Sequence, residues 1–357
     1  MSKMDPLVSI VIPTKNRRNL LRETIASVDA QTYSHWEAIV VDDGSKDQTG
    51  EMVRAITSTE KRVRFVRRER SPAGASTCRN LGVLAAQGEY IVFLDSDDLL
   101  AIPCLENRVK VMEANPKIDF AVFLTRIFHT APGDSPYLWN NFTTVDDLDR
   151  FLRRDMPWPT CGPLWRKTSL ARIGLWEERA LCAQDWEYHI RAITTGLSYL
   201  KIPEVDSYCR SVRPGSIGSS WGKRRHVCNR VRLFKNIIAV LRSKGLLTKQ
   251  RRRILAGEYY GHAFGLALGR RLALKIWISG WRARIVGNFE FIIVLAGEFV
   301  ALMVRRMNRF VSNRLFPESQ IARTHLKAMA PVSNLNQLAP ARDSMAKPFV
   351  GTDRYES

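Results

Sequence analysis

Short apolar runs alternate with amphipathic segments over the first hundred residues. Four runs rich in β-branched and aromatic residues, at 7–12, 36–41, 62–67 and 90–94, predict buried strands. The segments between them repeat apolar residues at helical spacing, as at 19–31. Strands and helices that alternate in this way form right-handed crossovers and a mainly parallel sheet. The pattern therefore predicts an α/β domain with a central, mainly parallel sheet.

Breaks in the pattern predict where elements end. Pro13 is expected to stop the first strand, because proline has no N–H to donate to a neighbouring strand. Gly88 is expected to close the helix that precedes the fourth strand. Residues 118–130 and 158–210 are expected to add further strands and two helices to the same body.

Two acidic clusters follow directly on the second and fourth predicted strands. The first is Asp42-Asp43, and the second is the run 95–98, which contains Asp95 and Asp97. Carboxylates at strand ends project into the crevice at the carboxyl edge, where open α/β sheets bind ligands. They repel each other unless a cation joins them, and a hard divalent ion that also holds a diphosphate is the natural candidate. The clusters favour an enzyme that acts on a nucleotide-diphosphate substrate.

Positive charge is concentrated in one segment. The net charge is +20, and residues 222–316 carry 21 Lys or Arg against three Glu, which is +18 of that total. Apolar stretches with Trp277 and Trp281 lie between the arginines. These features predict an interfacial helix or a short membrane hairpin on an anionic membrane surface, and leave open whether 285–304 spans the bilayer or lies on it. Nucleic acid is the less favoured partner for such a segment.

Composition supports a folded enzyme with an appendage. The chain has 357 residues, more than one typical domain, and 45% of them are hydrophobic. Its six cysteines form no CxxC pair, which argues against a zinc site or a disulfide framework and suits a reducing compartment. Residues 1–6 are too short and polar for a signal peptide. We expect a catalytic domain at 1–221, a basic amphipathic helical membrane-associated region at 222–316 and a disordered tail at 317–357.

Several motifs occur in a fixed order within residues 7–215. They include Val-Ser-Ile-Val-Ile-Pro-Thr-Lys-Asn at 8–16, Glu-Ala-Ile-Val-Val-Asp-Asp-Gly-Ser at 37–45, the aspartate-rich block at 88–98 and Gln-Asp-Trp-Glu at 184–187. This series resembles family 2 glycosyltransferases. The resemblance implies the GT-A fold, a nucleotide-sugar donor, a divalent metal (Mg²⁺ or Mn²⁺) and inversion at the anomeric carbon. Nothing in the basic segment is explained by it.

The resemblance also assigns roles to residues of the donor site. Asp43 matches the aspartate that accepts a hydrogen bond from uracil or thymine N3–H, so a UDP- or dTDP-sugar is the expected donor. Asp97 is expected to bind the metal, and Asp95 the ribose or a metal-bound water. The remaining nucleotide-sugar contacts are expected from Pro13, Thr14, Asn16, Arg79 and Arg213.

Structural alternatives stay open for several of these residues. Asn16 can cap the following helix, and Arg79 can form a surface ion pair. One of Asp42 and Asp43 can serve only to stabilise the Asp-Asp-Gly-Ser turn. Where relatives often carry a histidine that contacts metal or phosphate, this sequence has none, and Arg210 or Arg213 is expected to neutralise the diphosphate.

Asp185 matches the catalytic base of the family. A carboxylate within hydrogen-bond reach can deprotonate the acceptor hydroxyl as it attacks. Many relatives carry Glu-Asp here, and Gln184 removes the neighbouring carboxylate that would help to raise the pKa of Asp185. A helix cap is the alternative role for Asp185. Trp186 is expected either to form the floor of the acceptor site or to lie in the core, and His189 to be a packing residue.

Together these expectations describe a metal-dependent inverting glycosyltransferase at the cytoplasmic face of the cell membrane. Its acceptor would be a hydroxyl of a lipid-linked or surface-polysaccharide precursor. A polyprenyl-phosphate sugar transferase is the first alternative, and its acceptor phosphate needs no deprotonation. A non-enzymatic nucleic-acid-binding protein, acting through the basic segment, is the second. The sugar, the nucleotide, the acceptor, its linkage and the oligomeric state are not determined by the sequence.

Overall fold

The computed structural model describes residues 5–211, 223–264, 270–288, 292 and 349–350. The elements in chain order are β1 (Val8–Thr14), α1 (Arg18–Asp29), β2 (Trp36–Asp42), α2 (Thr49–Thr59), β3 (Val63–Arg67), α3 (Ala75–Ala85), β4 (Tyr90–Phe93), β5 (Leu99–Leu100), α4 (Cys104–Ala114), β6 (Phe120–Phe128), α5 (Asp147–Leu152), β7 (Pro163–Arg166), α6 (Lys167–Ile173), α7 (Gln184–Thr194), β8 (Tyr199–Arg210), α8 (Arg224–Ser243), α9 (Lys249–Phe264), α10 (Arg270–Arg282) and β9 (Phe349–Val350).

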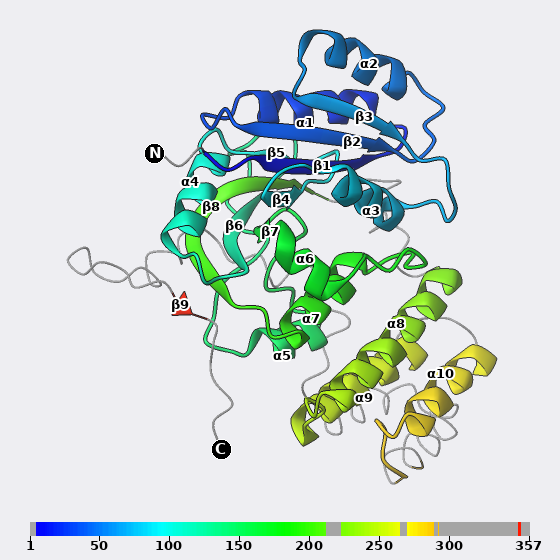
Figure 1. The fold of residues 1–357 in the computed structure, drawn as a ribbon. Helices are drawn as coiled ribbons and strands as arrows, with labels where there is room; N and C mark the ends of the chain where they lie inside the picture. The colour runs from blue at the N-terminus through cyan, green and yellow to red at the C-terminus, as the bar shows by residue number, and fades with distance from the viewer. Residues whose placement is uncertain (1–4, 212–222, 265–269, 289–291, 293–348, 351–357) are drawn as a thin grey trace.

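Among the described residues, nine strands form one sheet (Figure 1). Its order is β3-β2-β1-β4-β7-β6-β8-β5, and β9 pairs with β8. The four strands from β3 to β4 are parallel, as the alternating pattern predicted, and β6 is parallel to β8. However, β7 is antiparallel to β4 and to β6, and β5 is antiparallel to β8. The α/β fold is confirmed, with a sheet that is mixed rather than mainly parallel.

Helices cover both faces of the sheet (Figure 1). All seven residues of β1 are buried, because its side chains alternate between two cores. Ile10 and Ile12 share one core with apolar residues of α1 and α4, whereas Val11 shares the other with residues of α3 and α7. This arrangement leaves the carboxyl ends of β1, β2 and β4 as the edge where polar side chains can gather.

Pro13 lies inside β1, contrary to the predicted end of the strand. The carbonyl of Thr14 accepts a hydrogen bond from the Asp43 N–H on the β2 side, and the carbonyl of Val11 accepts one from the Leu94 N–H on the β4 side. The backbone N–H and C=O groups of successive residues point alternately to the two neighbouring strands. The backbone of Pro13 is therefore directed toward β4, as that of Val11 is. The β4 pairing ends at Val11, so the missing N–H of Pro13 costs no hydrogen bond of the ladder.

Gly88 does not close α3, which ends at Ala85. Its N–H donates to the Ser9 Oγ at 2.8 Å, and a Cβ at this position would lie 2.6 Å from the Leu7 carbonyl oxygen. Glycine is therefore required for the close approach of this loop to β1 rather than for a helix cap.

Helices α8, α9 and α10 continue the hydrophobic core beyond the sheet. The ring of Phe234 on α8 lies 5.1 Å from that of Trp186 on α7 and 5.9 Å from that of Tyr259 on α9. On the outer side, the rings of Tyr260 on α9 and Trp277 on α10 are 6.0 Å apart. Apolar packing thus crosses residue 222, where the sequence predicted a domain boundary.

Parts of the predicted basic region and tail lie outside the described residues. This applies to Arg213, to most of the possible span at 285–304, and to the tail at 317–357 apart from 349–350. None of the helices that the structure describes is both long and apolar enough to cross a bilayer.

Candidate active site

Asp43 lies just beyond β2, where three elements converge on its carboxylate. Its Oδ1 accepts hydrogen bonds from the Arg68 Nε at 2.5 Å and the Gly74 N–H at 2.9 Å, and its Oδ2 pairs with the Lys15 Nζ at 3.1 Å. Burial raises the pKa of Asp43, but the bonds from Gly74, Arg68 and Lys15 outweigh it, so the net shift is downward. The Asp43 carboxylate is therefore held ionised.

Asp42 has the turn-stabilising role that the sequence left open for one of the pair. Its Oδ1 accepts from the Ser45 N–H at 3.0 Å and from the Ser45 Oγ at 2.5 Å. Asn16 lies in the left-handed region with φ 51°, and its Oδ1 accepts from the Lys46 N–H at 2.7 Å. Asn16 does not cap α1, whose N-cap is Arg17. Instead it joins the loop after β1 to the turn after β2.

Arg79 on α3 is buried, so the alternative of a surface ion pair is wrong. Its guanidinium contacts the Asp95 Oδ1 at 2.6 Å and the Gln184 Oε1 at 3.0 Å. It also lies over the ring of Trp176, 4.5 Å from the centroid. Gln184 departs from the usual glutamate, yet it still holds Arg79. Because Gln184 is neutral, Asp95 is the anionic partner that balances the positive charge of Arg79.

Asp97 faces the loop after β1. Its Oδ2 pairs with the Arg17 Nη1 at 2.6 Å, and 24% of its side chain is exposed. Arg210, at the end of β8, donates from Nε to the Asp97 carbonyl at 2.9 Å and pairs with Glu23 at 2.5 Å. Asp98 is buried and accepts from the Arg210 N–H at 2.9 Å. Arg210 thus contacts the acidic loop, mainly by organising its backbone, and its neutralisation of the diphosphate stays a prediction.

Asp95 and Asp97 suit a divalent ion that is bound together with a diphosphate. Burial raises the pKa of Asp97, Arg17 opposes that shift, and the nearby Asp95 adds to it, so negative charge in this loop is only partly compensated. No group of three or more metal-ligating side chains gathers among the described residues. Mg²⁺ and Mn²⁺ need only one or two carboxylates when phosphate oxygens complete the shell. Asp95 and Asp97 would supply those carboxylates.

Asp185 is the second residue of α7 and is not its N-cap, which is Ala183. Its Oδ1 accepts from the Trp186 N–H at 2.8 Å. Burial raises the pKa of Asp185; the Trp186 N–H and Arg79 oppose that shift, and Asp95 adds to it. Asp185 therefore lies within electrostatic range of the Arg79–Asp95 pair, and its pKa is raised without a neighbouring glutamate.

Comparison with known proteins agrees with this geometry. Residues 9–170 match the model of glycosyl transferase family 2. The putative teichuronic acid biosynthesis glycosyltransferase TuaG of Bacillus subtilis is 38% identical over 112 residues, which cover 31% of this chain and 44% of TuaG. An uncharacterized glycosyltransferase of Methanocaldococcus jannaschii is 27% identical over 256 residues, covering 66% of this chain and 87% of that protein.

Residues 9–170 are therefore similar to family 2 glycosyltransferases. The chain shares its GT-A fold with S. aureus TarS, solved with UDP-GlcNAc, at a TM-score of 0.62 and 18% identity over 78% of this chain and 82% of that one. The chain spans less than half the length of the first curated relatives that it matches.

The family 2 match contains the three aspartates at the strand ends and ends before the proposed base. Asp43, Asp95 and Asp97 lie inside the matched residues, whereas Asp185 and the C-terminal helices lie beyond them. Two further predictions are settled by packing. Trp186 belongs to the core, because it is buried and donates from Nε1 to the Phe151 carbonyl at 2.6 Å. His189 is a packing residue, and burial lowers its pKa to about 3.

Sequence reasoning missed the cations that pair with the carboxylates at this edge of the sheet. Lys15 and Arg17 follow β1 directly, and Arg68 follows β3. The argument that placed aspartates at the carboxyl edge applies equally to these cations, because all of them leave parallel strands at the same side. Trp176, under Arg79, had no comparable signal, since it lies 97 residues further along the chain (176 − 79).

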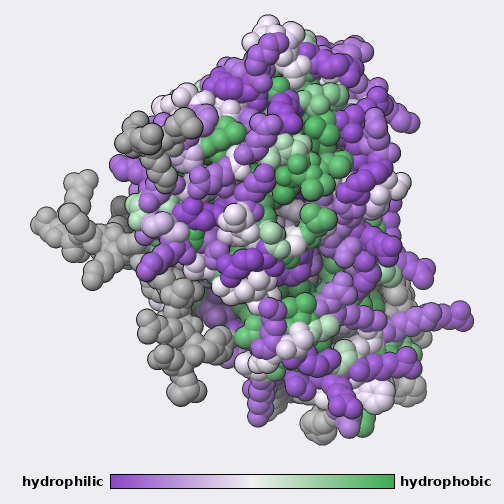
Figure 2. Space-filling model, viewed as in Figure 1, coloured by the Kyte–Doolittle hydropathy of each residue, from purple (hydrophilic) through white to green (hydrophobic). Residues whose placement is uncertain are grey.

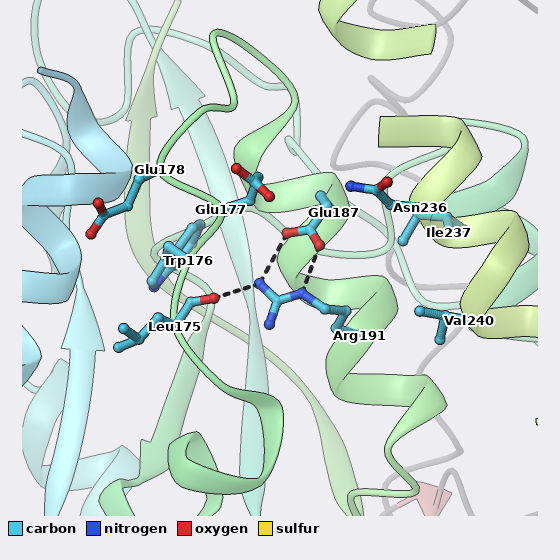
Figure 3. Close-up of a pocket in the computed structure, with 9 residues that line it drawn as sticks. All are labelled: Leu175, Trp176, Glu177, Glu178, Glu187, Arg191, Asn236, Ile237 and Val240. Atoms are coloured by element: carbon cyan, nitrogen blue, oxygen red, sulfur yellow. Dashed lines mark hydrogen bonds and ion pairs between the residues drawn. The ribbon is translucent and has the colours of Figure 1, made fainter. Parts of the chain in front are cut away.

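A pocket of about 360 Å³ lies between the loop at 175–178, α7 and α8 (Figure 3). Its charged groups are already paired: Glu187 with Arg191 at 2.6 Å, and Glu178 with Arg70 at 2.5 Å. None of the three donor-site aspartates lines it. The carboxyl edge of the sheet, and not this pocket, is the candidate active site.

Proposed function

We propose that this chain is an inverting glycosyltransferase that moves a sugar from a nucleotide-diphosphate donor to a hydroxyl group. The observation that carries the proposal is the convergence of Asp43, Asp95 and Asp97 at one sheet edge, inside the residues that match the family. Ionised Asp43 would accept from the N3–H of uracil or thymine, which makes a UDP- or dTDP-sugar the donor. Pro13, Thr14 and Asn16 would line the nucleoside beside it, and Arg213 is proposed to contact the diphosphate.

The diphosphate would lie over the acidic loop after β4. Asp97, with Asp95, would hold Mg²⁺ or Mn²⁺, which supplies neutralisation of the charge that grows on the leaving diphosphate. Arg17 and Arg79 add positive charge beside that position, because each already contacts one of the two aspartates. Gln184 and Trp176 hold the guanidinium of Arg79 in place, so Arg79 would not have to change rotamer to contact the diphosphate.

Asp185 is proposed as the general base. Direct displacement at the anomeric carbon requires the acceptor hydroxyl to lose its proton as it attacks, and Asp185 would accept that proton. A raised pKa brings this carboxylate closer to the operating pH, where a general base is most effective. Displacement from the face opposite the leaving diphosphate inverts the configuration at that carbon.

The acceptor is proposed to be a lipid-linked or surface-polysaccharide precursor at the cytoplasmic face of the cell membrane. TuaG, whose match covers 31% of the chain, is named for teichuronic acid biosynthesis. Between α8 and α10 lies a groove of about 530 Å³ lined by Lys235, Lys275 and Arg282 together with Ile278. These three cations form no ion pair with the described residues. Such a surface suits anionic phospholipid headgroups.

The first experiment screens donors by thermal stabilisation. We expect UDP- and dTDP-sugars, beginning with UDP-GlcNAc, to raise the melting temperature in the presence of Mn²⁺, because donor binding to the folded state adds about 2.7 kcal/mol at a hundredfold excess over Kd. GDP-mannose should stabilise much less, since guanine presents a different edge to Asp43. Absence of stabilisation by every nucleotide sugar, or equal stabilisation by GDP-mannose, would contradict the proposed donor site.

A second experiment tests the membrane surface. Combined Lys235→Ser, Lys275→Ser and Arg282→Ser should weaken binding to mixed anionic vesicles on the order of a hundredfold, because each basic residue near the surface contributes about 1 kcal/mol. The matched control replaces three exposed lysines of the catalytic domain, Lys61, Lys110 and Lys117, with serine. Co-sedimentation measures both. If both variants lose the same affinity, binding depends on net charge alone and the groove has no special role.

Figure 1 shows α8 and α10, which carry these residues, below the sheet in this view. In the lower part of Figure 2, where Figure 1 shows α8 and α10, apolar side chains appear between the charged ones. Leu274 and Trp281 on α10 are each at least 40% exposed. An apolar and cationic face of this kind fits the interfacial helix that the sequence predicted, and membrane contact there would leave the crevice accessible to a soluble donor.

A further inference from the structure

One asparagine of α8, Asn229, forms two hydrogen bonds with the loop that leads into α7. The Oδ1 of Asn229 accepts from the Leu181 N–H at 2.9 Å, and its Nδ2 donates to the Arg179 carbonyl at 2.8 Å. One side chain therefore satisfies a donor and an acceptor of the loop backbone, four and six residues before Asp185. Because the amide is planar, the two bonds fix the position and the orientation of this backbone together.

Two further contacts from α8 hold the start of α7. The buried Cys182 Sγ lies 3.7 Å from the His226 carbonyl oxygen and 3.6 Å from the Arg230 Nη1. Phe234 packs against Trp186, the residue that follows Asp185. Contacts from α8 thus lie on both sides of Asp185 along the chain. Figure 3 shows the same relation one turn further on, where α8 runs beside α7.

The backbone between these contacts adopts a conformation that it would not adopt by itself. Ala183, the N-cap of α7, has φ 55° and ψ 37°, in the left-handed region that alanine rarely occupies. Such a residue persists only where its surroundings over-determine it. Asn229 and Cys182 supply that constraint immediately before it, and the direction of the first turn of α7, which carries Asp185, follows from it.

We infer that α8 is a positioning element of the active site, and that Asn229 sets the place of the Asp185 carboxylate by holding the 179–183 loop. The inference rests on the proposed role of Asp185 as the base. It assigns a catalytic purpose to a helix that lies beyond the family match and that the sequence assigned to the membrane region. The catalytic unit would then extend to at least Ser243, the end of α8.

The test compares Asn229→Ala with Asn236→Ala. Asn236 lies two turns further along α8 and is exposed, and its side chain forms no hydrogen bond with the described residues. With the donor that stabilises the protein, hydrolysis by water also requires a base. We expect Asn229→Ala to lower kcat for donor hydrolysis on the order of tenfold, since small misplacement of a catalytic group has large effects on rate. The KM for the donor should change less than twofold, and Asn236→Ala should resemble the wild type.

Hydrogen exchange gives a readout that is independent of turnover. The Leu181 amide should exchange faster in Asn229→Ala, while amides of β1 and β4 keep their protection. Asn229→Asp keeps the acceptor for Leu181 and loses the donor to Arg179, so its kcat should fall between those of the other variants. An unchanged kcat in Asn229→Ala with a lowered melting temperature would overturn the inference and leave a stabilising role. If Asp185→Asn is itself fully active, the proposed base is wrong, which is a different outcome.

Discussion

Asp97→Asn should abolish metal-dependent turnover of the donor, with a loss of at least about a thousandfold. Removing one stabilising group from a developing anionic centre costs about that much in other enzymes, and here the change would also remove the main proposed metal ligand. The amide keeps the shape of the carboxylate but is a much weaker ligand for Mg²⁺ or Mn²⁺. Stabilisation by the donor should then become the same with Mn²⁺ and with a chelator.

The fold should survive this substitution. Burial raises the pKa of Asp97, so the folded state does not stabilise the ionised form of this carboxyl group. Replacing it with a neutral amide should therefore not destabilise the fold. Asp29→Asn is a matched control, because Asp29 is 59% exposed in its ion pair with Arg62. The control should retain full turnover. Normal turnover of Asp97→Asn in the presence of chelator would sink the metal proposal.

Asp185→Asn should lower turnover by about two to four orders of magnitude, the usual contribution of a general base. Donor affinity should persist, because Asp185 is proposed to act on the acceptor and not on the nucleotide. Isothermal titration with the donor and Mn²⁺, beside steady-state kinetics, separates the two quantities. Turnover within a few-fold of the wild type would mean that another group is the base or that the acceptor is already ionised. The second case would favour a polyprenyl-phosphate acceptor.

The pH dependence provides a further check on Asp185. A base acts only when it is deprotonated, so kcat should fall as the pH drops through the pKa of Asp185. Because burial raises that pKa, the acid limb should lie above the ordinary aspartate value of about 3.9. In Asp185→Asn this limb should disappear from the residual activity. If the acid limb of the kcat profile lies at the same pH in Asp185→Asn, the titrating group is not Asp185.

Much of the candidate site was predictable from local patterns. β-Branched runs predicted the strands, and an aspartate that follows a parallel strand must lie at the carboxyl edge whatever the rest of the fold does. Asp43, Asp95 and Asp97 were located in this way, and the structure places each of them at that edge. The roles of Asp42 and Asn16 were not predictable, because both depend on which backbone N–H lies within reach across two loops.

Contacts between distant segments account for what the sequence did not reveal. The orientation of β7 depends on the path of the chain between 129 and 162, for which no short motif exists, and this makes the sheet mixed. Arg79 meets Gln184 at a separation of 105 residues. Residues 222–316 were assigned to a membrane surface from their charge and hydrophobicity. Composition does not indicate which residues pack together, so the packing of α8 against α7 and α9 was not predicted.

By itself, therefore, the sequence determined the α/β fold, the family, and the aspartates at the strand ends, because periodicity and motif order are local properties of the chain. Tertiary structure alone decided which cation pairs with each aspartate, that Arg79 is buried, and that α8 packs against the start of α7. Each of these depends on two surfaces meeting in space, and a side chain such as Asn229 looks like any other polar residue of an amphipathic helix until its partner loop is known.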